Sequence, residues 1–172
     1  MKRNRMARNS HNLSHYRLAT CDMGQLIPVG CVEVLPGDSF KHRSQVLLRV
    51  QPLLKPLMHP VDIRIHHFYV PNRLIMDDWD EFITRSDDQL SVPTISYTSG
   101  ADTYDLLDHL GVPDVTRTIS ALPVRAYNLI YNDMYRDQDL ISEVSLDDLE
   151  LKYVAWQKDR FTSARSNPQP GS

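Results

Sequence analysis

The chain has 172 residues, which is the length of one domain or slightly more. Hydrophobic residues make up 41% of it and charged residues 24%, a balance that permits a packed core and excludes wholesale disorder. The apolar run at residues 23–32 is far too short to span a bilayer, so we expect no membrane partner. Two cysteines, Cys21 and Cys31, cannot build a disulfide framework; they are predicted to be small buried side chains in a reducing compartment.

The net charge of −3 conceals a basic N-terminus. Residues 1–21 contain no acidic residue, and they carry five cations, which are Lys2, Arg3, Arg5, Arg8 and Arg17. The rest of the chain holds 14 basic and 22 acidic residues, a charge of −8. A basic arm on an acidic body is typical of an arm that binds a polyanion, so these five cations are the candidate DNA contacts. A disordered, solubilising tail is the alternative.

Two segments in the first half alternate between apolar and polar residues, as half-buried antiparallel strands do. They cover residues 39–51 and 61–70, and the connection between them is stiffened by three prolines. The side chains predicted to face inward are Val46, Leu48, Val50, Ile63 and Ile65. Two strands are not stable alone in water, so partner strands are expected.

The second half has helical patterns. We expect helices over residues 77–85, where acids occupy the first turn, and over 103–110, which Gly111 ends. The strongest pattern covers 120–137, with a Ser120 cap, Pro123 in the first turn, and Tyr127, Ile130 and Met134 on one face. Ser145 and Asp148 predict a further helix start that leads to Tyr153 and Trp156. No later strand is predicted.

No motif for catalysis is present: the sequence lacks a phosphate loop, a dinucleotide fingerprint and a nucleophile elbow. We therefore predict no catalytic residue and no cofactor. His59, His66 and His67 invite a metal interpretation, but neighbouring strand residues point to opposite faces, so His66 and His67 do not readily share an ion, and no metal site is predicted. The acidic cluster at Asp77, Asp78, Asp80 and Glu81 is explained by stabilisation of a helix N-terminus.

Three motifs carry a resemblance to a known family. They are PGDSF at residues 36–40, HPVDIRIHHFYVPNR at 59–73 and RAYNLIYND at 125–133. With their flanks, over residues 11–84, 122–140 and 155–172, they resemble the major capsid protein of microviruses, small phages with single-stranded DNA, and the gokushovirus-like branch in particular.

The resemblance implies a mainly β fold with helical insertions, a viral jelly-roll β-sandwich. In that scheme residues 1–20 are a basic arm, 21–70 hold the first core strands, and 71–172 form a helix-rich first insertion. Family members continue for several hundred residues, so we expect this chain to be an N-terminal fragment that is truncated before the remaining strands.

The function implied is structural. Copies of the protein would close a T=1 icosahedral shell around a circular single-stranded DNA genome, with other virion proteins and a host receptor as further partners. The location would be the virion, after assembly in the host cytoplasm. Two alternatives stay open: a stand-alone single-stranded nucleic-acid-binding module that uses the arm, and a metal-dependent hydrolase built on His59, His66, His67 and the acidic cluster.

Overall fold

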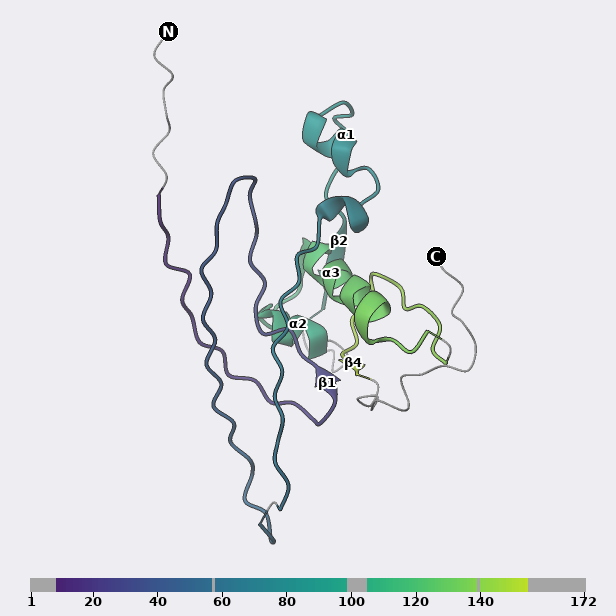
Figure 1. Ribbon diagram of the computed structural model, residues 1–172. Helices are drawn as coiled ribbons and strands as arrows, with labels where there is room; N and C mark the ends of the chain where they lie inside the picture. Colours follow the sequence, from purple (N-terminus) through teal and green to yellow (C-terminus); the bar gives the residue numbers. More distant parts are fainter. Residues whose placement is uncertain (1–8, 57, 99–104, 139, 155–172) are drawn as a thin grey trace, which may run out of the picture.

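The computed structural model describes residues 9–56, 58–98, 105–138 and 140–154. It divides into a small packed body, formed mainly by the second half of the chain, and long extended segments from the first half (Figure 1). The chain is mostly non-helical, and its sheets are small and antiparallel. Within the described residues, no helix has the length and apolar character needed to cross a membrane.

Two short sheets hold the body together. Strands β2 (Thr94–Tyr97) and β3 (Arg117–Ser120) pair antiparallel, with Ile95 opposite Ile119. Strands β1 (Gln25–Leu26) and β4 (Lys152–Tyr153) form a two-residue ladder that joins segments far apart in the sequence. Neither pair was predicted as strands. Strands of two or four residues give too short an alternation to be recognised, and their pairing depends on distant partners.

The helices α1 (Trp79–Thr84), α2 (Asp105–Leu110) and α3 (Leu122–Ile130) lie inside the three ranges first predicted. Local signals explain this agreement. Pro123 stands in the first turn of α3, and Gly111 ends α2 with a positive φ of 86°. A short 3-10 helix, η1 (Asn72–Leu74), precedes α1.

The predicted buried face of the 120–137 segment is only partly correct. Tyr127 is buried as expected, but Met134 is 64% exposed. The α-helix changes at its end into a π-helical turn, η2 (Tyr131–Tyr135), whose wider winding rotates later side chains away from the α-helical register. Val124, Asn128 and Tyr131 complete the buried stripe instead.

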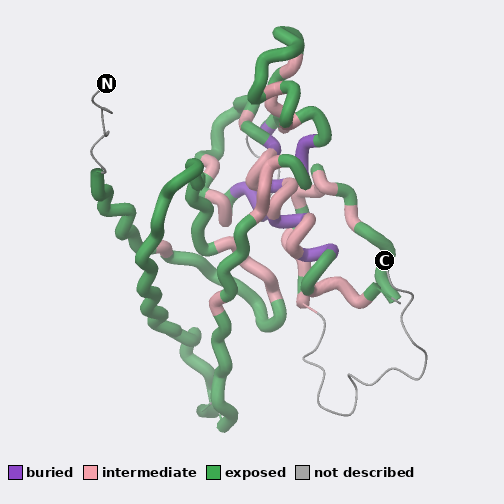
Figure 2. The backbone as a smooth tube through the Cα atoms, turned by 45° about the horizontal axis from the view of Figure 1, so that its top comes forward, coloured by how far each residue is buried: buried purple, intermediate pink, exposed green. Residues whose placement is uncertain are grey.

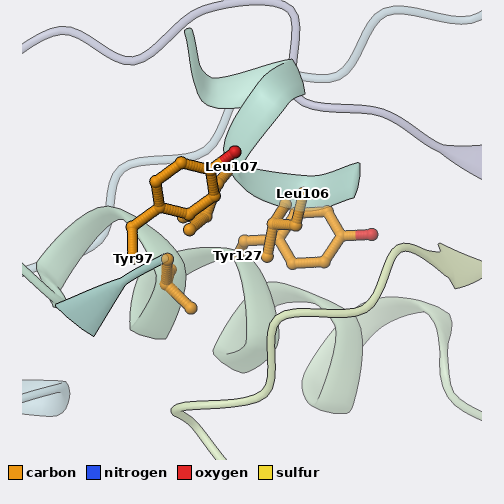
Figure 3. Close-up of a cluster of buried hydrophobic side chains, with 5 residues drawn as sticks. Tyr97, Leu106, Leu107 and Tyr127 are labelled. Atoms are coloured by element: carbon orange, nitrogen blue, oxygen red, sulfur yellow. The ribbon is translucent and has the colours of Figure 1, made fainter. Parts of the chain in front are cut away.

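The hydrophobic core is small and lies between α2, α3 and β2 (Figure 3). Leu106 and Leu107 of α2 and Val124 of α3 are fully buried, and the rings of Tyr97 and Tyr127 pack against them. Half-buried side chains from several loops and strands surround this centre: Leu26, Ile95, Leu110, Val112, Ile119, Leu149 and Leu151. The body is therefore a folded unit with its own core.

The first-half segments 39–51 and 61–70 are extended, but neither forms a strand with a described partner. Figure 2 shows them as exposed along nearly their whole length, in contrast to the buried centre of the body. The predicted inward face is thus not buried in this chain: Val46 is 53% and Ile63 47% exposed. The reason is that no described segment covers it.

The position of the core predicts that alanine substitutions at two leucines have very different effects on stability. Leu106→Ala should destabilise the body by about 2–5 kcal/mol, because it leaves a cavity among fully buried neighbours. Leu54→Ala, at a fully exposed position, should change the free energy of unfolding by less than about 0.5 kcal/mol. Urea unfolding followed by circular dichroism measures both, and equal losses would contradict the assignment of the core.

Candidate functional site

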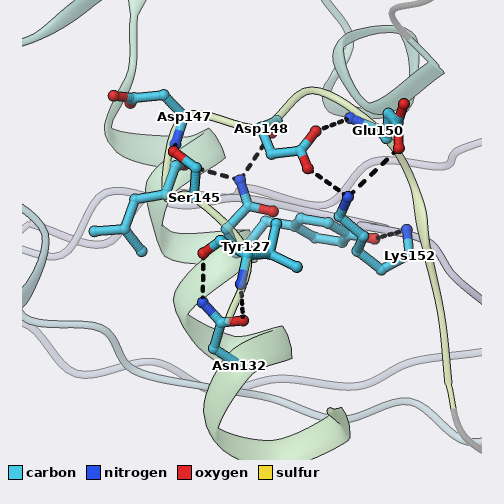
Figure 4. Close-up of polar contacts among 10 residues, drawn as sticks. Tyr127, Asn132, Ser145, Asp147, Asp148, Glu150 and Lys152 are labelled. Atoms are coloured by element: carbon cyan, nitrogen blue, oxygen red, sulfur yellow. Dashed lines mark hydrogen bonds and ion pairs between the residues drawn. The ribbon is translucent and has the colours of Figure 1, made fainter. Parts of the chain in front are cut away.

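The side chains of α3 and η2 hold the loop that follows them (Figure 4). The Asn128 side-chain amide donates to the carbonyl oxygens of Leu146 and Asp148, each at 2.8 Å. The Asn132 amide pairs with Val144 in both directions, donating at 2.8 Å and accepting at 3.1 Å. Both asparagines are buried, where an unpaired amide would be costly.

These contacts explain why the helix predicted from Ser145 is wrong. The segment after Ser145 is a turn and an irregular stretch, followed by β4. Two of its carbonyls are hydrogen-bonded to Asn128 rather than to amides four residues further on. Side chains from α3 thus replace the helical hydrogen bonds that the local sequence favours.

The Tyr127 hydroxyl forms hydrogen bonds with both β1 and β4, which are far apart in the sequence. It donates to the Leu26 carbonyl oxygen at 2.8 Å and accepts from the Lys152 backbone N–H at 2.8 Å. The same side chain therefore contacts both strands of the β1–β4 pair. Burial raises the pKa of Tyr127 to about 12.

Two ion pairs strengthen the same region. Arg125 binds Asp147 through two nitrogens, at 2.6 and 2.8 Å, and donates to the Ile75 carbonyl at 3.1 Å. The hydrogen bond with Asp147 raises the pKa of Arg125. Burial alone would raise the pKa of Asp148, but hydrogen bonds, chiefly from the Lys152 ammonium at 2.6 Å, outweigh it and lower that pKa.

Four of the residues that make these contacts belong to the RAYNLIYND motif at 125–133. They are Arg125, Tyr127, Asn128 and Asn132. The sequence alone gave them no role beyond helical periodicity. A signal was present, however, because two asparagines on the apolar stripe of a helix predict buried amides that need partners.

Tyr127→Phe should weaken the body and alter its pH dependence. Loss of the hydroxyl leaves the Leu26 carbonyl and the Lys152 amide without their partner, at a cost of about 1–3 kcal/mol. In the unchanged chain, the raised pKa makes stability fall as the pH rises from about 10 towards 12, since the unfolded tyrosine ionises first. The variant should lose this part of the decline in chemical unfolding measured between pH 8 and 12. An identical pH profile would contradict the role of the hydroxyl.

The second feature is an apolar surface on the extended segments. We define the extended apolar surface as Phe40, Val46, Leu48, Val50, Val61 and Ile63, which are each about half exposed. In contrast, Leu47, on the opposite face, is 86% exposed. Among the described residues of 39–56 and 61–70, no backbone hydrogen bond pairs these segments with each other or with the body. Unpaired backbone edges and apolar side chains on one face of a segment are features of a surface that another element covers.

The histidines that suggested a metal site face different neighbours. The His66 imidazole stacks on the Tyr135 ring and forms a hydrogen bond with its hydroxyl, while His67 lies edge-on to His42 with ring centres 4.4 Å apart. His66 and His67 thus have different ring partners, although both adjoin the same hollow. No group of three or more potential metal ligands gathers within the part of the chain that the structure describes. A shallow, open hollow adjoins His66, His67, Phe68, Met134 and Tyr135.

The acidic cluster lies where the sequence placed it. Asp80 and Glu81 occupy the first turn of α1, and Asp78 precedes that helix without forming a side-chain cap. Carboxylates in this position stabilise the helix through its dipole. Cys21 and Cys31 differ from their prediction, because both thiols are exposed and unbonded. The physical reason is that they lie on extended segments outside the hydrophobic core, although partial burial still raises the pKa of the Cys31 thiol.

Of the predicted DNA contacts, Lys2, Arg3, Arg5 and Arg8 lie outside the described residues. Arg17 is described, and it is half-buried. Its guanidinium lies against Gly111, at the end of α2.

A small packed body together with an extended apolar surface that no described segment covers is typical of a protein that contacts further elements or other chains. Comparisons with known proteins assign the chain to a family of structural proteins. Residues 1–169 match the phage family described as capsid protein (F protein), and the chain belongs to this family.

Individual relatives have the same description. The chain is 33% identical to the capsid protein VP1 of Bdellovibrio phage phiMH2K, over 95% of this chain and 34% of that protein. It is 35% identical to the capsid protein VP1 of Chlamydia phage 1, over 77% of this chain and 25% of that protein. The capsid protein VP1 of Spiroplasma virus 4 is 30% identical, over 99% of this chain and 36% of that protein. The chain thus spans between a quarter and about a third of the length of these relatives.

The comparisons confirm the resemblance found in the sequence. A mostly non-helical chain with small antiparallel sheets is compatible with a viral capsid protein.

Proposed function

We propose that this chain acts as a structural component of a phage capsid, a T=1 icosahedral shell around a circular single-stranded DNA genome, and that it performs no catalysis. The observation that carries the proposal is the extended apolar surface, which is left uncovered in a chain whose relatives are named as capsid proteins. A shell subunit needs such surfaces, because symmetric neighbours bury them. Its location would be the virion, after assembly in the host cytoplasm.

Within this proposal, segments 39–51 and 61–70 are the first core strands of a jelly-roll β-sandwich, and 71–172 is a helix-rich insertion. The alternation of exposure supports the strand assignment, since Val46 and Leu48 are each less exposed than Leu47 between them. The strands that would pair with them come from elsewhere in the sandwich. The body, with its own core, then projects from the sandwich as a folded insertion.

The partners in this proposal are other copies of the protein and the single-stranded DNA genome, with other virion proteins and a host receptor in addition. The arm supplies the DNA contact through Lys2, Arg3, Arg5 and Arg8. The support is electrostatic: these cations belong to a segment without acids, while the rest of the chain carries −8. The comparisons do not favour a stand-alone nucleic-acid-binding module, since each relative named above is a capsid protein.

A matched pair of substitutions tests the assembly surface. Val46→Asp places a charge on the extended apolar surface, whereas Leu47→Asp places it on the opposite, more exposed face. Neither residue belongs to the core of the body, so both variants should keep the melting temperature of this chain within about 2 °C. In phage-producing cells, Val46→Asp should abolish particles because burial of an unpaired charge is costly, and Leu47→Asp should be tolerated. The number of particles is counted by electron microscopy. A normal particle yield with Val46→Asp would contradict the burial of the extended apolar surface during assembly.

Neutralising the arm tests the DNA contact. Replacement of Lys2, Arg3, Arg5 and Arg8 together by Gln should leave the thermal stability nearly unchanged, because in this proposal these charges act on DNA and not on the fold. It should lower the DNA content of particles and make DNA retention less sensitive to salt. The ratio of ultraviolet absorbance at 260 and 280 nm, followed over a salt series, measures both effects. Unchanged packaging would reduce the arm to a solubilising tail.

A further inference from the structure

The end of the arm is attached to the body at the C-terminus of α2. His109, in the last turn of α2, donates from its Nε2 to the Thr20 carbonyl oxygen at 3.2 Å. Three residues earlier, the Arg17 guanidinium lies so close to Gly111 that a β-carbon there would stand 2.9 Å from Nη2. Two independent contacts therefore fix residues 17–20 on the same helix end.

Glycine is required at position 111 for two separate reasons. Its φ of 86° lies in the left-handed region, which favours glycine after a helix. In addition, the Arg17 guanidinium lies where a β-carbon would stand, so a side chain at position 111 would have to displace it. Gly37 has only the first requirement: its φ is 90°, and an added β-carbon would meet nothing within 4 Å. The two glycines thus separate backbone strain from the contact with Arg17.

The contact divides the five arm cations into two groups. Four of them lie within residues 2–8, and residues 9–16 carry no formally charged side chain at neutral pH. The fifth, Arg17, is half-buried against the body, beside the carbonyl end of a helix, where a cation is favoured. A side chain held in this way is poorly placed to follow a flexible polyanion.

We propose that Arg17 is a positioning residue that anchors the arm to α2 at Gly111 and does not contact single-stranded DNA. This inference rests on the proposed function, because it assigns a division of roles within the arm. The anchor also sets a limit on reach: residue 2 can lie at most about 50 Å from Arg17, the length of the intervening chain when fully extended.

Limited proteolysis of the 172-residue chain with trypsin tests the anchor, because trypsin cleaves after Arg17 only when that segment leaves the body. Gly111→Ala should speed this cleavage by about tenfold relative to Gly37→Ala, which carries comparable backbone strain without the clash. Cleavage after Arg125, inside the body, reports global unfolding and should stay slow in both variants. Equal rates of cleavage after Arg17 in the two variants would overturn the anchor.

A second test combines the added β-carbon of Gly111→Ala with removal of the Arg17 guanidinium. Gly111→Ala should lower the melting temperature more than Gly37→Ala does. Part of this loss should be recovered when Arg17→Ala is added, because the crowded side chain is gone. Additive shifts of the melting temperature in this cycle would overturn the contact, even if the single variant proves too unstable for proteolysis.

Binding of oligothymidylate by the same chain over a salt series tests the division of roles. Each cation that contacts a phosphate contributes about 0.7 to the slope of log affinity against log salt. Arg8→Gln should therefore reduce the slope by about 0.7, and Arg17→Gln should leave it unchanged. A reduction of about 0.7 with Arg17→Gln would overturn the inference. If the fourfold Gln variant binds like the original chain, the proposed DNA contact fails instead, while the proteolysis still decides the anchor.

Discussion

The body depends on the hydrogen bonds made by the side chains of α3. Tyr127 and Asn128 join this helix to strands and loops from both ends of the described chain. The segment they hold, residues 144–151, has no regular secondary structure, so its backbone groups need these partners. Because the hydrophobic core is small, such buried polar contacts do more than add stability. They determine a single path for the loop that leads back to β4.

This arrangement separates two kinds of surface in one chain. The body has a closed core, and the buried amide nitrogens of Asn128 and Asn132 donate to loop carbonyls, whereas Oδ1 of Asn128 has no partner among the described residues. Among the described residues, the extended apolar surface has neither partner strands nor cover. Under the proposed function, this surface is buried in a larger sandwich or against neighbouring copies in the shell. In this proposal, the body folds in one step, and the extended apolar surface is covered in another.

The charge distribution follows the same division. The acidic residues lie outside the arm, and their ion pairs, such as Arg125 with Asp147, are used within the body. The arm, with no acid of its own, is tied down at Arg17 and Thr20. In the proposed function, the basic arm attracts a nucleic acid that the acidic remainder of the chain repels. A fixed base of the arm would then define where this attraction acts.

The sequence by itself determined the family, through three motifs, and the helices α1, α2 and α3, through local signals such as Pro123 and Gly111. It did not determine β2 and β3, whose short pairing depends on contacts between distant residues. Only the tertiary structure showed that Asn128 takes the loop carbonyls that a helix after Ser145 would have used, and that Arg17 packs on Gly111. Helix signals lie within one or two turns of the chain and can be recognised locally. The partners of a buried amide or a docked guanidinium are chosen by the fold, which brings together residues that the sequence keeps far apart.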